Sequence, residues 1–289
     1  MGSMSDKPVR RVRMLVPIIV SLSMAWLFLA LIMLSSVEPL MLLLTPFEEP
    51  TNGQDFEVLL RNPMPYLNAL VFLGVVFAGS VLVVIFLKLL KKFVRALVTG
   101  ALWLVAFSVL SFYTLVCLRA LLLESNLYNI WLPAVVLMAT VTAYISTSKR
   151  GLLSLLTCGL ISTGAGVALG NSIPFWTAIV LLLAISVYDV LAVLRGHLRI
   201  LKEHELESLR GLVVKYDDLM IGLGDMFFYA FLTSFATLHM GVLAGIGGTF
   251  GMLVGYVLTL KLLERRWMLP GLPIPILIGL VLALLFGYL

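Results

Sequence analysis

Nine runs of mostly apolar residues, joined by short polar connections, constrain the fold of this chain more than any other feature. An α-helix needs roughly 20 apolar residues to cross the hydrocarbon core of a bilayer. Only 12% of the residues are charged and 61% are hydrophobic, whereas a soluble domain carries about 25% charge. The runs therefore predict an all-α, multi-pass protein of the cell membrane with nine transmembrane helices. They cover residues 14–35, 65–87, 96–118, 130–146, 152–169, 174–194, 219–238, 241–262 and 270–289.

Lysine and arginine alternate between the two sides of the predicted spans. Of the 20, 18 lie in the N-terminal tail or in the connections after the second, fourth, sixth and eighth runs. Only Arg61 and Arg119 fall on the opposite side. Because cytoplasmic connections carry the excess of Lys and Arg, we expect a cytoplasmic N-terminus and an extracytoplasmic C-terminus.

The tail and connections suggest a simple domain organisation. Residues 1–13 are expected to form a cytoplasmic tail, of which 1–4 resemble a vector-derived remnant. Residues 14–289 are expected to form a single nine-helix domain. The stretch 195–218 mixes charges of both signs, which predicts a cytoplasmic connection with some amphipathic helix. The first run is too long for a cleavable signal peptide, and the net charge of +5 reflects membrane orientation rather than nucleic-acid binding.

Glycines recur at helical spacing in the fifth and eighth runs. Glycines four residues apart leave one helix face bare and allow another helix to pack closely. Close packing is the expected role, and a flexible wall that admits a substrate is the alternative. The residues are Gly164, Gly166 and Gly170, and Gly241, Gly245, Gly247, Gly248, Gly251 and Gly255.

Asp189 and Asp225 are the only acidic residues deep inside the apolar runs. A charged side chain in hydrocarbon is costly, so such residues mark functional sites. Asp189 lies six residues before Arg195, and Asp225 lies six residues after Leu219. At the helical rise of 1.5 Å per residue, both would lie about 9 Å below the cytoplasmic face. The spacing predicts that the two carboxylates meet at one depth.

Two carboxylates in a low-dielectric site share one proton, which suits peptide hydrolysis. The ionised member takes a proton from water, and the protonated member hydrogen-bonds the scissile carbonyl. The runs contain no credible Ser-His-Asp or Cys-His site, and no metal or other cofactor is expected. An ion-coupled transporter or cation leak channel is the alternative, because intramembrane acids also relay protons. A silent scaffold that binds transmembrane helices is a third possibility.

The neighbours of the two acids fit this chemistry. Gly222 and Gly224 leave room for backbone and water beside Asp225. Tyr188 places a hydroxyl next to Asp189, although ordinary packing explains it equally well.

The ninth run opens with Leu269-Pro270-Gly271-Leu272-Pro273-Ile274-Pro275. Proline removes a backbone donor and disfavours helix in the residue before it. Extended backbone is therefore expected at Leu269, Leu272 and Ile274, with free amides and carbonyls that could pair with an unwound substrate. The alternative is a helix that begins with proline in its first turn.

Three motifs resemble those of the presenilin and signal-peptide-peptidase family of intramembrane aspartyl proteases. They are Tyr188-Asp189 in the sixth run, Gly222-Leu223-Gly224-Asp225 in the seventh and Pro270-Gly271-Leu272 at the ninth, in the family's order. The resemblance implies nine spans, with Asp189 and Asp225 as the catalytic pair. Gly271 departs from the alanine that is usual there. The residues that the resemblance and the local context mark as substrate-binding or site-shaping are Tyr188, Gly222, Leu223, Gly224, Pro270, Gly271 and Leu272.

The resemblance also implies partners and processing. The substrates would be transmembrane helical proteins or peptides within membrane lipid, and no nucleic acid is involved. The predicted orientation matches that of presenilins, which implies substrate spans with external N-termini. Because 195–218 is too short for the cleavable insert of animal presenilins, we expect one unprocessed chain of a microbial, archaeal-type homologue.

Overall fold

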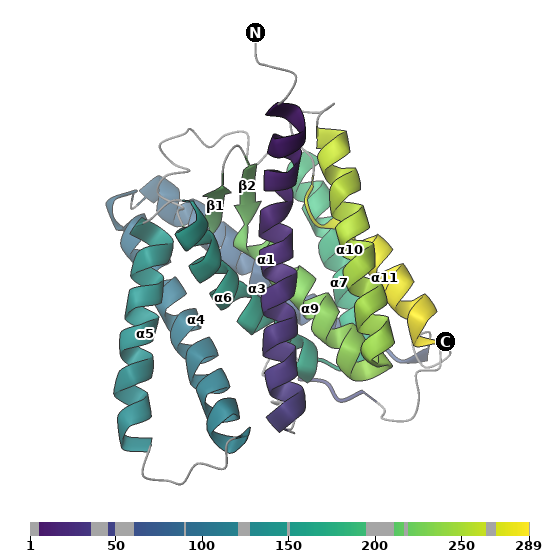
Figure 1. Cartoon of the computed structure of the whole chain (residues 1–289), viewed down its shortest axis with the longest axis horizontal. Helices are drawn as coiled ribbons and strands as arrows, with labels where there is room; N and C mark the ends of the chain where they lie inside the picture. The colour runs from purple at the N-terminus through teal and green to yellow at the C-terminus, as the bar shows by residue number, and fades with distance from the viewer. Residues whose placement is uncertain are drawn as a thin grey trace. The chain divides into compact units, whose positions relative to one another are not determined.

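Helices built from the apolar runs make up nearly all of the computed structural model of this chain (Figure 1). The structure describes residues 6–35, 46–49, 61–89, 91–120, 128–148, 151–194, 211–216, 219–263 and 270–288. In these ranges every expected run overlaps a helix. The helices are α1 (Asp6–Ser35), α3 (Met64–Leu89), α4 (Lys91–Ala120), α5 (Tyr128–Ser148), α6 (Leu152–Ser172), α7 (Phe175–Leu194), α9 (Leu223–Met240), α10 (Val242–Leu263) and α11 (Pro273–Gly287).

Seven helices in the described part are long and apolar enough to cross a membrane, which makes the chain a multi-pass integral membrane protein. The fourth and fifth runs looked short, but α5 and α6 each have 21 residues. Two helices are not among the seven: α9, which carries Asp225, and α11, which has only 15 residues.

A short β-hairpin interrupts the all-α pattern that the sequence predicted. Strand β1 (Val213–Tyr216) pairs antiparallel with β2 (Leu219–Gly222), with Val213 opposite Gly222 (Figure 1). The expected start of a helical span at Leu219 is therefore wrong. The β-branched and aromatic residues of Val-Val-Lys-Tyr favour a strand. Residues 195–210, where the amphipathic helix is expected, and residues 217–218 lie outside the described part.

The chain divides into two compact units, and α6 and α9 each contribute to both. In the first unit, α1 buries one continuous stripe against its neighbours. Ile18, Leu22, Ala25, Leu29 and Ile32 all lie on that stripe, at the spacing of one helix face. The first unit comprises 1–37, 93–166 and 203–230.

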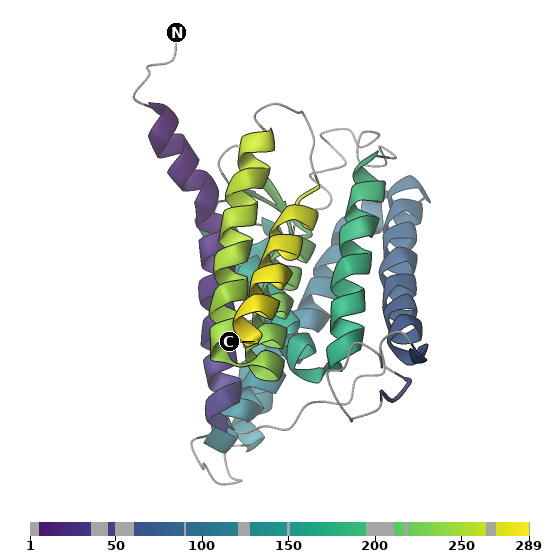
Figure 2. The same ribbon diagram turned by 90° about the vertical axis from the view of Figure 1, so that its right-hand side faces the viewer.

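The second unit comprises residues 38–92, 167–202 and 231–289 and contains α3, α7, α10 and α11. Helices α10 and α11 lie side by side (Figures 1 and 2). A Cβ added at Gly251 would lie 2.7 Å from the Ile278 carbonyl oxygen. One added at Gly255 would lie 2.5 Å from the Pro275 Cα. Gly251 and Gly255 therefore serve close helix packing, as expected. Gly241 does not, because it lies between α9 and α10 at φ 100° and a Cβ there would meet nothing within 4 Å.

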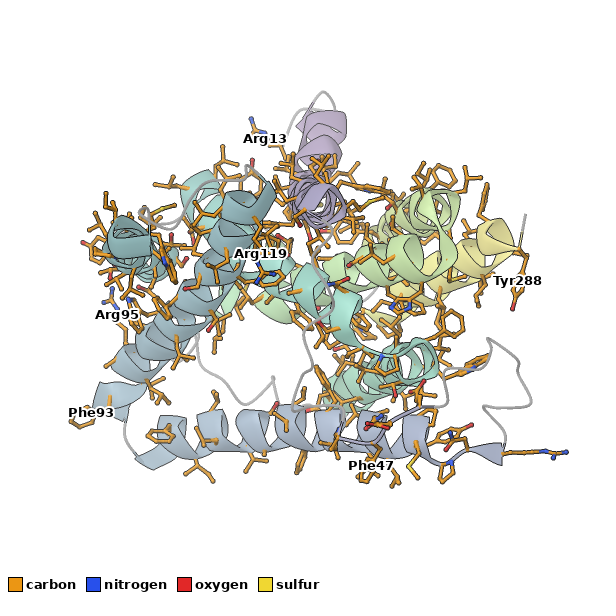
Figure 3. All side chains as sticks on the ribbon, turned by 90° about the horizontal axis from the view of Figure 1, so that it is seen from below. Arg13, Phe47, Phe93, Arg95, Arg119 and Tyr288 are labelled. Carbon is orange, nitrogen blue, oxygen red and sulfur yellow. The ribbon has the colours of Figure 1, made fainter. Side chains whose placement is uncertain are left out.

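Residues 46–49, called the strap below, form hydrogen bonds near the starts of both α3 and α7 within the second unit. The fully buried Asn68 donates to the Phe47 carbonyl at 2.8 Å and accepts from the Phe47 amide at 3.1 Å. Phe47 is labelled in Figure 3. The Glu49 carboxylate accepts hydrogen bonds from the Thr177 amide at 2.9 Å and from the Thr177 hydroxyl. First-turn amides have no partner within a helix, so Glu49 caps α7.

Candidate active site

Asp189 lies on α7 in the second unit, five residues before the helix ends at Leu194. Its Oδ2 accepts a hydrogen bond of 3.0 Å from the backbone amide of Leu272. The amide of Gly271 hydrogen-bonds the same carboxyl group. The first and third sequence motifs therefore meet at an acid inside a membrane span, through main-chain donors rather than side chains.

The backbone geometry after Pro270 differs from the extended form that the sequence predicted. Leu272 has φ −86° and ψ −41°, which is helical, and Ile274 lies inside α11. Leu269 is outside the described residues. The proline run instead begins α11, with proline in its first turn, where a missing N–H costs nothing because it would have no intrahelical partner. The amides of Gly271 and Leu272, ahead of the first turn, are left to bond Asp189.

Asp225 is the third residue of α9 and lies in the first unit. Because Leu219–Gly222 form a strand, with about 3.3 Å per residue rather than 1.5 Å, the depth expected for Asp225 from a continuous helix is wrong. The last residue of β2, Gly222, is followed directly by Leu223, the first residue of α9. The Leu223 amide donates to the Leu212 carbonyl at 2.8 Å and so continues the pairing of the hairpin.

Gly222 and Gly224 closely precede Asp225 in the sequence. A Cβ added at Gly222 would lie 3.8 Å from the Asp225 carboxyl carbon, which is ordinary contact distance. A Cβ added at Gly224 would meet nothing within 4 Å outside its own chain neighbours.

Two neighbouring helices hold the start of α9 within the first unit. The Ser21 hydroxyl of α1 donates to the Met226 carbonyl at 3.2 Å, and both residues are buried. From α6, an added Cβ at Gly166 would lie 3.1 Å from the Phe227 carbonyl carbon. Sequence reasoning marked Gly166 for close packing but missed Ser21, which nothing in the sequence distinguishes from other helical serines.

Tyr188 connects α7 with α3 in the second unit. Its hydroxyl donates to Ser80 Oγ at 3.4 Å, and Ser80 in turn donates to the Val76 carbonyl at 2.9 Å. The Tyr188 side chain is partly exposed. This contact links α7 to α3 one residue before Asp189. In the described ranges no three His, Cys, Asp or Glu side chains gather where they could hold a metal ion.

Comparison with known proteins identifies the family. The profile of the Presenilin family matches residues 9–214, most of the chain. The match includes Asp189 and ends before Asp225. Presenilin-B of Dictyostelium discoideum is 38% identical over 122 residues, which cover 38% of this chain and 25% of that protein. The chain thus matches only about a quarter of that relative's length.

Solved structures show the same fold. A presenilin family intramembrane aspartate protease in space group C222 matches with a TM-score of 0.67 and 18% identity, over 95% of this chain and 98% of that one. A structure of such a protease in space group P2 matches with a TM-score of 0.62 and 19% identity, over 95% and 96%. The chain therefore has a presenilin-type membrane fold. It belongs to the presenilin family.

Proposed function

We propose that this protein is an intramembrane aspartyl endopeptidase that hydrolyses peptide bonds within transmembrane helices, with Asp189 and Asp225 as its catalytic pair. The observation that carries the proposal is the hydrogen bond from the Leu272 amide to Asp189. It joins two of the three presenilin-type motifs at an acid within a span. Asp225 ends the remaining motif, Gly222-Leu223-Gly224-Asp225, in the first turn of α9.

The reaction needs one proton shared between two carboxyl groups. The ionised aspartate removes a proton from a water molecule, which attacks the scissile carbonyl carbon while the protonated aspartate hydrogen-bonds the carbonyl oxygen. The tetrahedral intermediate then collapses. The C–N bond breaks, and the leaving nitrogen takes a proton from the acid that received one. No covalent enzyme intermediate forms and no cofactor takes part.

The main-chain contacts of Asp189 suit this role. Amides of Gly271 and Leu272 fix the orientation of the carboxyl group without introducing a second charge. Fixed dipoles in a water-poor site act more strongly than they would in water, and they need no reorganisation during the reaction. Pro270, Gly271 and Leu272 thus shape the site through their backbone. Tyr188, Gly222, Leu223 and Gly224 border the two acids.

A transmembrane substrate must unwind before water can attack its backbone. In the described part of the chain, strands lie at β1 and β2, directly ahead of Asp225. A strand edge offers amides and carbonyls with which an unwound peptide can pair. We place substrate pairing at this hairpin rather than at the proline run, because Leu272 is helical.

The topology of the proposed enzyme follows from the distribution of charges. Nine spans form one protease domain over residues 14–289, with a cytoplasmic N-terminus and an extracytoplasmic C-terminus. The two aspartates then lie towards the cytoplasmic side, and products leave in that direction. Substrates are transmembrane helical proteins or peptides whose cleaved spans have external N-termini. The ion-transport alternative has no support in the family or the fold.

Cleavage of a single-span peptide in liposomes tests the proposal. The wild-type protein should cut inside the span, nearer its cytoplasmic end, as read from product masses. The Asp189→Asn variant should give no product while retaining the thermal unfolding midpoint (Tm) of the wild type. Cleavage by the variant, or a cut near the external end of the span, would contradict the proposed site or its placement.

A further inference from the structure

The hydroxyl of Ser21 is one of a few helical hydroxyls of this protein that donate to a different helix. Serine and threonine in a helix commonly donate to the carbonyl four residues earlier in the same helix. Ser80, Thr99 and Ser186 do so here, at 2.7 to 2.9 Å. Ser21 instead donates across to another helix, to the Met226 carbonyl of α9.

The surroundings of Ser21 do not otherwise call for a polar residue. Among the described residues of α1, the buried positions around it include Ile18, Leu22 and Ala25, and Ser21 itself has no exposed surface. A buried hydroxyl is costly unless it is hydrogen-bonded. An alanine would pack on this stripe without that cost, so the value of Ser21 lies in the bond that it makes.

That hydrogen bond attaches α1 to the start of α9, next to Asp225. Met226 directly follows Asp225, and its carbonyl belongs to the first turns of α9, which begins at Leu223. On the α6 side, Gly166 lets the backbone of Phe227 approach closely. The first two turns of α9 are thus held by a hydrogen bond from α1 and by close packing against α6, all within the first unit.

We propose that Ser21 is a positioning residue for Asp225. Its hydrogen bond fixes the rotation and depth of the first turn of α9, and so the direction of the Asp225 carboxyl group. Ser21 touches neither substrate nor water in the reaction. The inference rests on the proposed protease function for its effect on turnover, but its effect on α9 does not depend on that function.

Ser234 provides a matched control in the same helix. Its hydroxyl is also fully buried and also donates to a carbonyl of another helix, that of Val167 at 3.0 Å. It lies nine residues after Asp225, about 13 Å along the helix axis. Replacing either serine by alanine removes one buried hydrogen bond between helices, but only Ser21→Ala removes it beside Asp225.

The test compares Ser21→Ala with Ser234→Ala in two measurements on the full chain. In cleavage of a single-span peptide, Ser21→Ala should lower kcat about tenfold or more, with KM changed less than about twofold, because misplacement of a catalytic group by about 1 Å can cost 100-fold. Ser234→Ala should leave kcat within about twofold of wild type. Ser21→Cys, which keeps the size and a weak donor, should lie between Ser21→Ala and wild type.

The second measurement does not depend on activity. Hydrogen exchange followed by mass spectrometry should show faster exchange at the start of α9 in Ser21→Ala and not in Ser234→Ala. If both variants lower kcat equally, or if Ser21→Ala leaves exchange at the start of α9 unchanged, the positioning role is refuted. If the wild type cleaves no peptide, the protease proposal fails, and the exchange result still decides whether Ser21 holds this turn.

Discussion

Replacing Gly255 by alanine tests how the packing of α10 on α11 supports Asp189. The added Cβ would lie 2.5 Å from the Cα of Pro275 and 2.9 Å from the carbonyl oxygen of Ile274. These are backbone atoms, so no side-chain rotation can relieve the contact. Helix α11 must move, together with the Leu272 amide at its start, which donates to Asp189 at 3.0 Å.

Two opposing effects decide the result. Alanine in place of glycine favours a helix by about 1 kcal/mol. Overpacking of a tight interior costs about 1–3 kcal/mol. Ordinary contact between carbon atoms begins at about 3.5 Å, so relief of the clash needs a displacement of about 1 Å. We therefore expect a net loss of stability, and a loss of turnover that approaches 100-fold if the whole displacement reaches the Leu272 amide.

The assay combines the Tm in detergent with the cleavage rate of a single-span peptide. Gly74→Ala, in helix α3 of the same unit, is the control because an added Cβ there meets nothing within 4 Å. It should leave Tm equal to or above that of wild type and leave cleavage unchanged. If Gly255→Ala behaved like Gly74→Ala, the claim that close helix packing fixes the amides on Asp189 would be refuted.

Three further outcomes are expected. Glu49→Gln should lower Tm, because glutamine keeps an acceptor for the Thr177 amide but loses the negative charge at the start of α7, worth about 0.3–1 kcal/mol. Asn68→Ala should lower Tm further, since the Phe47 amide and carbonyl lose their partner. A Tm unchanged in both variants would exclude a stabilising role for the strap. The dependence of kcat/KM on pH should be bell-shaped, reporting a coupled acid and base, and a flat profile from acidic to neutral pH would argue against a shared proton. Asp225→Asn should raise Tm or leave it unchanged, because asparagine brings no charge into the membrane, whereas a marked fall would indicate that Asp225 has mainly a structural role.

The sequence predicted the helices well because their signal is local. A run such as 174–194 must satisfy its own backbone in the membrane, and a helix achieves that within one segment. The apolar runs therefore correspond closely to α7 and its neighbours. The glycine spacing of the eighth run predicted close packing for the same reason, since four-residue intervals place Gly251 and Gly255 on one helix face.

The errors lie where tertiary contacts outweigh the local pattern. Leu219–Gly222 read as the start of an apolar span, but the segment pairs with Val213–Tyr216 as a strand. Pro273 and Pro275 predict extended backbone at Leu272 and Ile274, but these residues adopt the alternative, a helix start with proline in its first turn. In both places composition alone supported two structures, and the pairing partner or the helix start decided between them.

The contacts of the candidate site were only partly predictable. The acids were conspicuous because Asp189 and Asp225 are the only carboxylates deep in the apolar runs. The donors to Asp189 are backbone amides, which carry no sequence signature. Ser21 resembles any serine in a helix until its partner on α9 is known.

The most direct test of the central claim is the cleavage of a single-span transmembrane peptide by wild type, Asp189→Asn and Asp225→Asn in the same liposomes. Product masses identify the cut, and Tm shows that each variant remains folded. If both aspartates are catalytic, the wild type should cleave within the span, and neither folded variant should cleave. Near-normal cleavage by either variant would contradict the claim that the two aspartates act together on one peptide bond.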